Sequence, residues 1–234
     1  MLLWDTFFDA GEAQLKKGKY GKAEQLLKSA LGEANSFEPD DPRLLKTLLA
    51  LISVYQSNKR PKEAEPHLRR AEELISPPTT VEPSAQSDVV RAQLKQLEFE
   101  DPDPHAETAL RERLVNIWAE AGPEYQDQLL QSLLELTNSQ RESSDEESAR
   151  EHLMRALKVA EELGGAHSEA VDRMLELVIE SFIVSQHWQQ AEGYGTQRLE
   201  VQTALYGEDD PRLAPTLATQ STVLEKQRRM PEAL

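Results

Sequence analysis

The stretch EPDDPRLLKTLLA, residues 38–50, decides the fold, because the chain repeats nearly the same phrase as GEDDPRLAPTLAT at residues 207–219. The two copies of Asp-Asp-Pro-Arg-Leu begin at Asp40 and Asp209, so 169 residues separate them. This distance is close to four units of about 42 residues, a period typical of helical repeat arrays. The phrase therefore suggests that the whole chain is built from repeats.

Small residues recur at the same interval. Each of these residues stands near the start of the second helix of a helix pair. In both helices of such a pair, apolar residues recur with the helical period of 3.6. The spacings of 41, 42, 43, 42 and 42 residues are too regular for chance, and they join Ala23, Ala64, Ala106, Ala149, Ala191 and Ala233. We predict an all-α chain of antiparallel helix pairs.

In this register the chain forms a single array over residues 1–234. Its repeats span about 3–38, 41–76, 84–121, 124–163, 167–205 and 210–234, the last of them incomplete. From the third repeat on, the expected helices are 86–100, 104–121, 124–141, 146–163, 167–186, 188–205 and 210–228.

Local signals mark the joints between these helices. Asp41 is expected to cap a helix that has Pro42 in its first turn, and Ser144 with Glu147 reads as a capping box, although residues 143–151 could instead form an acidic interaction patch. Proline-rich residues 76–84 predict a mobile loop, and residues 100–104 a rigid turn.

Composition and charge restrict the possible partners. The net charge of −16 argues against nucleic acid, whose binding depends on Lys and Arg displacing counterions. The same charge is repelled by anionic membranes, and the apolar stretches are too short for membrane insertion. Because the chain has no cysteine, we expect no disulfide or thiol chemistry and a cytoplasmic location.

These residues resemble the tetratricopeptide repeat (TPR) family, in the longer subclass of about 42 residues found in kinesin light chains. The closest single match is TLLALISVYQSNKRPKEAEPHLRRAEELI, residues 47–75. The resemblance covers essentially the whole chain and implies a right-handed superhelical solenoid whose concave groove is lined by the first helix of each pair. Arg113 and Arg198 depart from the pattern, since they stand where the family has a small residue, and they predict looser or shifted packing.

The resemblance also implies a protein-interaction scaffold or adaptor that binds a peptide or helical segment of a partner. The family's carboxylate-clamp positions fall on Phe8, Glu12 and Ala50, which cannot bind a carboxylate. Its paired asparagines are replaced by Leu49 and Ala50 and by Ala218 and Thr219, which argues against those two binding modes.

The concave positions instead mix apolar residues with charges of both signs, which suits an amphipathic or extended segment; a solvated groove without a ligand is the alternative. The candidate partner-binding residues are Phe8, Glu12, Lys46, Leu49, Ser53, Arg91, Lys95, Arg173, Glu176 and Glu180.

No catalytic, cofactor or metal site is predicted. The five histidines fall in different repeats without ligand spacing, and they are expected at the surface or in packing: His67, His105, His152, His167 and His187. Trp118 and Trp188 are expected to pack between repeats. Trp4, near the end of the array, is expected to be exposed and available for self-association.

The last residues, Met230–Leu234, read as the first turn of the second helix of a sixth hairpin. This reading predicts either a segment excised from a larger protein or an open C-terminal end that another chain completes, with self-association through that end as one form. A regulatory TPR domain of a multidomain enzyme or sensor is therefore the alternative to a free-standing adaptor.

Overall fold

The computed structural model describes residues 3–38, 41–76, 80–101 and 103–229. These residues form eleven α-helices and two short 3-10 helices, and the described part of the chain contains no strand. The chain divides into two compact units, Met1–Ile117 and Trp118–Leu234, with the boundary inside one helix. The all-α fold of antiparallel helix pairs is therefore confirmed, whereas the continuous array over both units stays a prediction.

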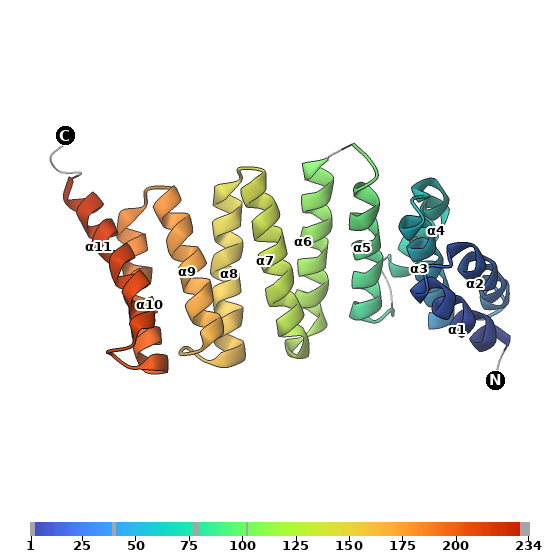
Figure 1. Ribbon diagram of the computed structural model, residues 1–234, viewed down its shortest axis with the longest axis horizontal. Helices are drawn as coiled ribbons and strands as arrows, with labels where there is room; N and C mark the ends of the chain where they lie inside the picture. The colour runs from blue at the N-terminus through green and yellow to red at the C-terminus, as the bar shows by residue number, and fades with distance from the viewer. Residues whose placement is uncertain (1–2, 39–40, 77–79, 102, 230–234) are drawn as a thin grey trace. The chain divides into compact units, whose positions relative to one another are not determined.

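The N-terminal unit consists of three helix hairpins (Figure 1). Successive hairpins pack through the second helix of one and the first helix of the next, so that α2 contacts α3 and α4 contacts α5. The helices are α1 (Leu3–Lys16), α2 (Tyr20–Ala34), α3 (Pro42–Ser57), α4 (Pro61–Ile75), α5 (Pro83–Leu97) and α6 (Pro104–Ala121), the last of which crosses into the second unit.

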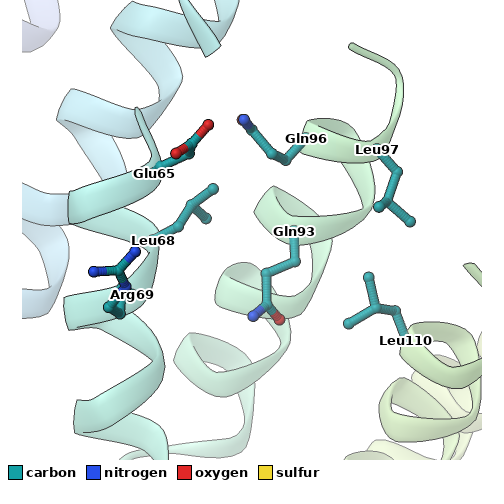
Figure 2. A pocket seen from close by; sticks show the side chains of 7 residues that line it. All are labelled: Glu65, Leu68, Arg69, Gln93, Gln96, Leu97 and Leu110. Carbon is teal, nitrogen blue, oxygen red and sulfur yellow. The ribbon is translucent and has the colours of Figure 1, made fainter. Parts of the chain in front are cut away.

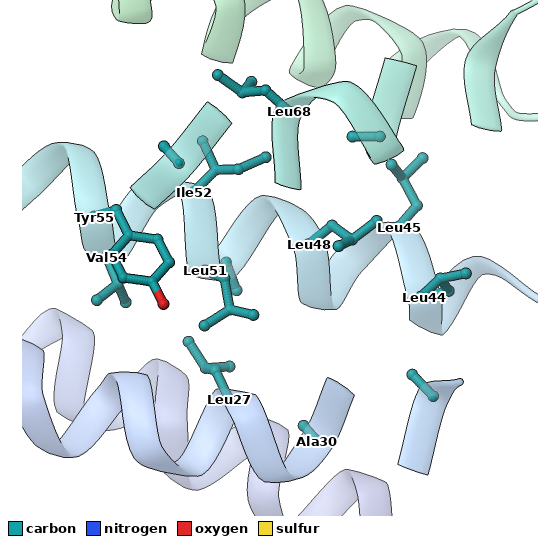
Figure 3. Close-up of a cluster of buried hydrophobic side chains, with 14 of the residues drawn as sticks. Leu27, Ala30, Leu44, Leu45, Leu48, Leu51, Ile52, Val54, Tyr55 and Leu68 are labelled. Atoms are coloured by element: carbon teal, nitrogen blue, oxygen red, sulfur yellow. The ribbon is translucent and has the colours of Figure 1, made fainter. Parts of the chain in front are cut away.

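Small and large apolar residues alternate in the core of this unit. Ala23, Leu27 and Ala30 on α2 are completely buried. Leu27 and Ala30 face α3, which contributes Leu48 and Leu51 to the same core (Figure 3). The alanines let the helices approach closely, while the leucines fill the space between hairpins. This is the packing that the Ala-x-x-x-Leu-x-x-Ala pattern predicts.

The C-terminal unit contains two hairpins and one further helix after the end of α6. Its core includes Leu153, Val178, Phe182, Ala191 and Val223, with Phe182 stacked on Tyr194 at a centroid distance of 5.4 Å. The helices are α7 (Gln126–Glu142), α8 (Glu146–Gly164), α9 (Glu169–Val184), α10 (Trp188–Tyr206) and α11 (Ala214–Arg229); the 3-10 helices Pro123–Tyr125 and Pro211–Leu213 precede α7 and α11.

The repeated phrase forms the same joint in both units. The Asp41 carboxylate accepts a hydrogen bond from the Arg43 backbone N–H at 2.9 Å, which caps α3 as expected. The Arg43 guanidinium also bonds Asp41 and lies 3.7 Å from the Phe37 ring centroid. At the second copy, Arg212 bonds Asp210 and lies 3.5 Å from the Tyr206 ring centroid. The phrase is therefore a joint that fixes the chain between two helices.

Two predicted helix starts and one predicted helix cap differ from the structure. Helix α11 begins at Ala214, after the 3-10 helix Pro211–Leu213, and not at residue 210. Helix α5 begins at Pro83 and not at residue 86, because proline is well suited to the first position of a helix. At α8 the capping residue is Asp145, whose carboxylate accepts from the Ser148 N–H. Ser144 instead has a positive φ of 64°, so the predicted capping box was placed one residue too early.

Trp4 is not exposed, contrary to the prediction. It is 7% accessible, its indole N–H donates to Thr47 Oγ1 at 2.9 Å, and its ring stacks on Phe8. The cover comes from α3 of the next hairpin. This removes the basis for self-association through Trp4.

The other tryptophans lie as expected, since Trp118 is 5% accessible and Trp188 packs against the core of the C-terminal unit. Parts of the predicted loop and turn at residues 77–79 and 102, and the predicted helix turn at 230–234, lie outside the described residues. Within the described helices, none is both long and apolar enough to cross a membrane.

Candidate protein-binding face of the N-terminal unit

Helix α3 exposes only a narrow stripe. Ten of its residues are buried, among them Leu45, Leu48 and Ile52, because α1, α2, α4 and α5 all pack against it. The accessible stripe contains three of the predicted binding residues, spaced at helical intervals, Lys46, Leu49 and Ser53. The three residues proposed for binding on α3 are therefore accessible to a partner.

The repeat register places equivalent residues on the neighbouring first helices. Helix α3 contacts both α1 and α5, so the three stripes lie next to one another within this unit. We call these nine residues the first-helix face: Asp5, Phe8 and Glu12 on α1; Lys46, Leu49 and Ser53 on α3; Asp88, Arg91 and Lys95 on α5. With helix axes about 10 Å apart, this face is about 20 Å wide.

The middle of the face is apolar on α1 and α3, and Arg91 occupies the equivalent position on α5. Phe8 and Leu49 hold equivalent positions in the first two repeats, and both are half-buried against the unit's core. Phe8 is held by Trp4, whose ring lies 4.6 Å from it in a stacked arrangement. A fixed aromatic ring beside a leucine gives a partner an apolar contact that does not require reordering of the face.

Two lysines of the face have no ion-pair or hydrogen-bond partner among the described residues. Lys46 and Lys95 are both exposed, on α3 and α5. By contrast, Glu12 lies 3.6 Å from Lys16 on its own helix. The charged residues of the face are balanced in number, three acidic and three basic, and Lys46 and Lys95 are its two exposed lysines, although the protein as a whole is strongly acidic.

Asp88 belongs to this face but was missed by the sequence argument, which named only Arg91 and Lys95 on α5. Partial burial raises the pKa of the Asp88 carboxyl, and the positive charge of Arg91 works in the opposite direction. Its position could have been found by carrying the register from Lys46 to the next repeat.

Arg173, Glu176 and Glu180 lie on α9 in the C-terminal unit and form the equivalent stripe there. All three are exposed, and Glu176 bonds Arg198 at 3.0 Å. The neighbouring stripes carry uncharged residues, Leu134 on α7 and Ala218 on α11 among them. These three residues thus belong to a different and more acidic surface.

The histidines show no catalytic or metal-binding arrangement. His67 stacks on Tyr55, and burial lowers its pKa with help from the charges of Lys28 and Arg70. His152 Nδ1 lies 3.0 Å from Gln140 Oε1. Across the described ranges, no group of three or more His, Asp or Glu side chains could hold a metal ion.

The helix pairs and their small-residue packing correspond to known structures. RapI in its apo form is 12% identical over 99% of this chain and all of that chain, with a TM-score of 0.57. A protein of Podosopora anserina built of nearly identical kinesin light chain TPR-like repeats is 16% identical over 87% of this chain and 97% of its own, with a TM-score of 0.56. The fold is that of the tetratricopeptide repeat.

A further TPR structure is part of a larger protein. The signal transduction ATPase with a tetratricopeptide repeat sensor from Pyrococcus horikoshii is 15% identical over 93% of this chain and 32% of that chain, with a TM-score of 0.54. No protein-family profile and no curated protein sequence matches the chain. At these identities the TPR fold is what the similarity establishes, and TPR folds are generally protein-interaction modules.

Proposed function

We propose that the protein is an interaction scaffold whose N-terminal unit binds a short segment of a partner protein on the first-helix face. The observation that carries this proposal is the apolar pair Phe8 and Leu49 on a face that also carries two exposed lysines without a partner among the described residues, Lys46 and Lys95. Exposed cations beside apolar side chains suit a partner of complementary pattern.

The proposed partner segment carries an apolar side chain that covers Phe8 and Leu49, with acidic residues that approach the two lysines. A face about 20 Å wide accommodates about six residues of an extended chain, at roughly 3.3 Å per residue. The acidic residues would favour association and set its orientation, while the apolar contact would supply most of the affinity. The C-terminal unit is not required for this contact.

The test is selection of a random dodecapeptide library, displayed on phage, against the immobilised full chain. We expect the enriched peptides to share an apolar residue flanked by Asp or Glu, and to be lost when Lys46→Glu and Lys95→Glu are combined. The matched control combines Lys19→Glu with Lys62→Glu, two exposed lysines outside the face. Peptides that lack acidic residues, or that bind both double variants equally, would refute the proposal.

A further inference from the structure

A pocket lies between α4, α5 and α6, entirely within the N-terminal unit. It has a volume of about 320 Å³ and is a shallow depression, largely open to solvent. Figure 2 shows Leu68, Leu97 and Leu110 pointing toward it, one from each helix. This volume is at the lower end of the range for ligand pockets, so it suits a side chain better than a large cofactor.

The pocket faces away from the first-helix face. Successive helical residues are 100° apart, so Gln93, which lines the pocket, lies roughly 200° around α5 from Arg91. Gln96 and Leu97 line it from the same side. A ligand here would occupy a second site, and its binding does not depend on the proposed function of Lys46 and Lys95.

The pocket is explained by a departure from the repeat pattern. Arg113 on α6 stands where α2 and α4 have Ala30 and Ala71, and its guanidinium bonds Glu72 on α4 at 2.7 Å. Gln93 Nε2 donates to the other oxygen of the same carboxylate at 3.0 Å. A long ion pair thus replaces the close contact that a small residue would allow.

Hydrogen bonds also fix the second glutamine of the wall. Gln96 Nε2 donates to the Pro61 carbonyl oxygen at 3.1 Å, and Gln96 Oε1 accepts from Gln56 at 3.2 Å. Because the amide groups of Gln93 and Gln96 bond neighbouring helices, both side chains are held in place. The pocket is therefore preformed.

The side of Leu110 that remains uncovered is apolar. Leu110 holds the repeat position of Leu27 and Leu153, which are both fully buried, yet Leu110 remains partly accessible. Leu27 and Leu153 belong to the apolar cores of their units. An aliphatic group placed against Leu110, Leu68 and Leu97 would remove the apolar surface of these leucines from water.

Two charged residues at the pocket indicate which groups a ligand would carry next to its aliphatic side chain. Glu65 and Arg69 are exposed and lie one turn apart on α4, and neither has an ion-pair or hydrogen-bond partner in the described part of the chain. Since the pocket is open, one side chain can enter while the remainder of the ligand stays outside near these charges. A polypeptide can place one apolar side chain in the pocket and keep its neighbouring charged residues outside.

We propose that the pocket receives a leucine-like side chain of a partner polypeptide, with a basic residue of that polypeptide near Glu65 and an acidic residue near Arg69. The contact is a second docking point, separate from the first-helix face. It would allow one partner to be held at two places or two partners to be held at once.

The absence of native cysteine permits a direct test by disulfide capture. A Glu65→Cys chain is equilibrated with blocked tripeptides as mixed disulfides in the presence of a reductant, and the captured fraction is measured by intact mass. The probes are Cys-Leu-Asp, Cys-Leu-Lys and Cys-Gly-Asp. We expect Cys-Leu-Asp to be captured about tenfold more than Cys-Gly-Asp, because its leucine is buried, and more than Cys-Leu-Lys, because Arg69 faces its carboxylate.

Three variants make the result specific. The preference for aspartate over lysine should invert when Arg69→Glu is added, and the preference for leucine should disappear when Leu110→Trp fills the pocket. If that variant does not fold, as judged by circular dichroism, Leu97→Phe replaces it. A Glu63→Cys chain, with the thiol on the same helix but outside the pocket lining, should show neither preference.

Equal capture of the leucine and glycine probes would overturn the proposal. So would the same preference at Glu63→Cys, or a preference that survives a filled pocket. None of these outcomes depends on Lys46 or Lys95, so failure here is distinguishable from failure of the first-helix face.

Discussion

Arg198 Nε lies 2.9 Å from Asp172 Oδ1, and this bond joins α10 to α9 through side chains that are only 12% and 13% exposed. Arg198 stands at the repeat position of Ala156, where the pattern calls for a small residue. Burial disfavours its charge, but the bonds and charges of Asp172 and then Glu176 outweigh that penalty, so the pKa of Arg198 is raised. The departure from the pattern is thus a specific contact between helices, not merely looser packing.

Arg198→Met should destabilise the protein, because it leaves the Asp172 carboxylate largely buried without its cation. We expect a loss of about 2 kcal/mol in the free energy of unfolding, measured by urea denaturation. Combining it with Asp172→Asn should recover part of the loss. As a control, Arg212→Met removes an exposed ion pair and should cost much less. Equal effects of the two arginine changes would contradict the prediction.

The joint aspartates should titrate abnormally low. The pKa of Asp210 is lowered to about 2, first by the Arg212 side chain and then by the Arg212 backbone N–H. Since the folded pKa is below the unfolded value of about 3.9, the stabilisation is complete above that value and is lost as the pH falls through about 2. A carbon-13 carboxyl titration should show this shift, and Arg212→Gln should raise the pKa toward normal.

The pKa of Asp41 is also lowered, chiefly by the side chain of Arg43. Arg43→Gln should therefore raise the pKa of Asp41 and leave that of Asp210 unchanged. A normal pKa for Asp210 in the unmodified protein would show that the joint does not form in solution.

Thr47→Val should destabilise the N-terminal unit, because it leaves the buried Trp4 indole N–H without its acceptor. It also removes the Thr47 hydroxyl bond to the Arg43 carbonyl oxygen at 2.6 Å. A loss of about 1–2 kcal/mol is expected. Denaturation can be followed by Trp4 fluorescence in a chain whose other two tryptophans are phenylalanine, with the exposed Thr222→Val as control. No loss with Thr47→Val would indicate that Trp4 is not covered by α3.

Gly11→Ala and Gly32→Ala should have opposite effects on stability. A Cβ at Gly11 would lie 2.7 Å from Leu27 Cγ in the core, so overpacking should cost about 1–3 kcal/mol. At Gly32, on α2, a Cβ meets nothing within 4 Å, and alanine should stabilise the helix by about 0.5–1 kcal/mol. Thermal unfolding of both variants tests this difference; a stabilising Gly11→Ala would contradict the packing of α1 on α2.

The repeat register could be predicted from sequence because each repeat obeys the same local rules. Alanines at a fixed interval, Asp41 before Pro42 and the glycines between hairpins are all local signals. Most helix boundaries follow from them to within about three residues. The start of α8 was predicted, but its cap was assigned to Ser144, because Ser144 and Asp145 are both good caps and only the backbone conformation distinguishes them.

Features that depend on neighbouring hairpins could not be predicted in this way. Trp4 is covered by Thr47, 43 residues away, so its burial is a tertiary property. Leu110 stands at a repeat position that is buried in other hairpins. Its partial exposure arises from the ion pair between Arg113 on α6 and Glu72 on α4. Lys46, Leu49 and Ser53 lie on the accessible side of α3 because the register fixes which side of that helix the neighbouring helices cover; that they bind a partner stays a prediction.

The central claim is that the first-helix face recognises an acidic and apolar segment through Lys46 and Lys95. The most direct measurement is fluorescence anisotropy of one labelled, enriched peptide titrated with the full chain at two salt concentrations. The account predicts that Lys46→Glu with Lys95→Glu weakens binding at least about tenfold in low salt, and that the difference shrinks as salt rises. Equal affinity for this variant and for the Lys19→Glu, Lys62→Glu control would contradict it.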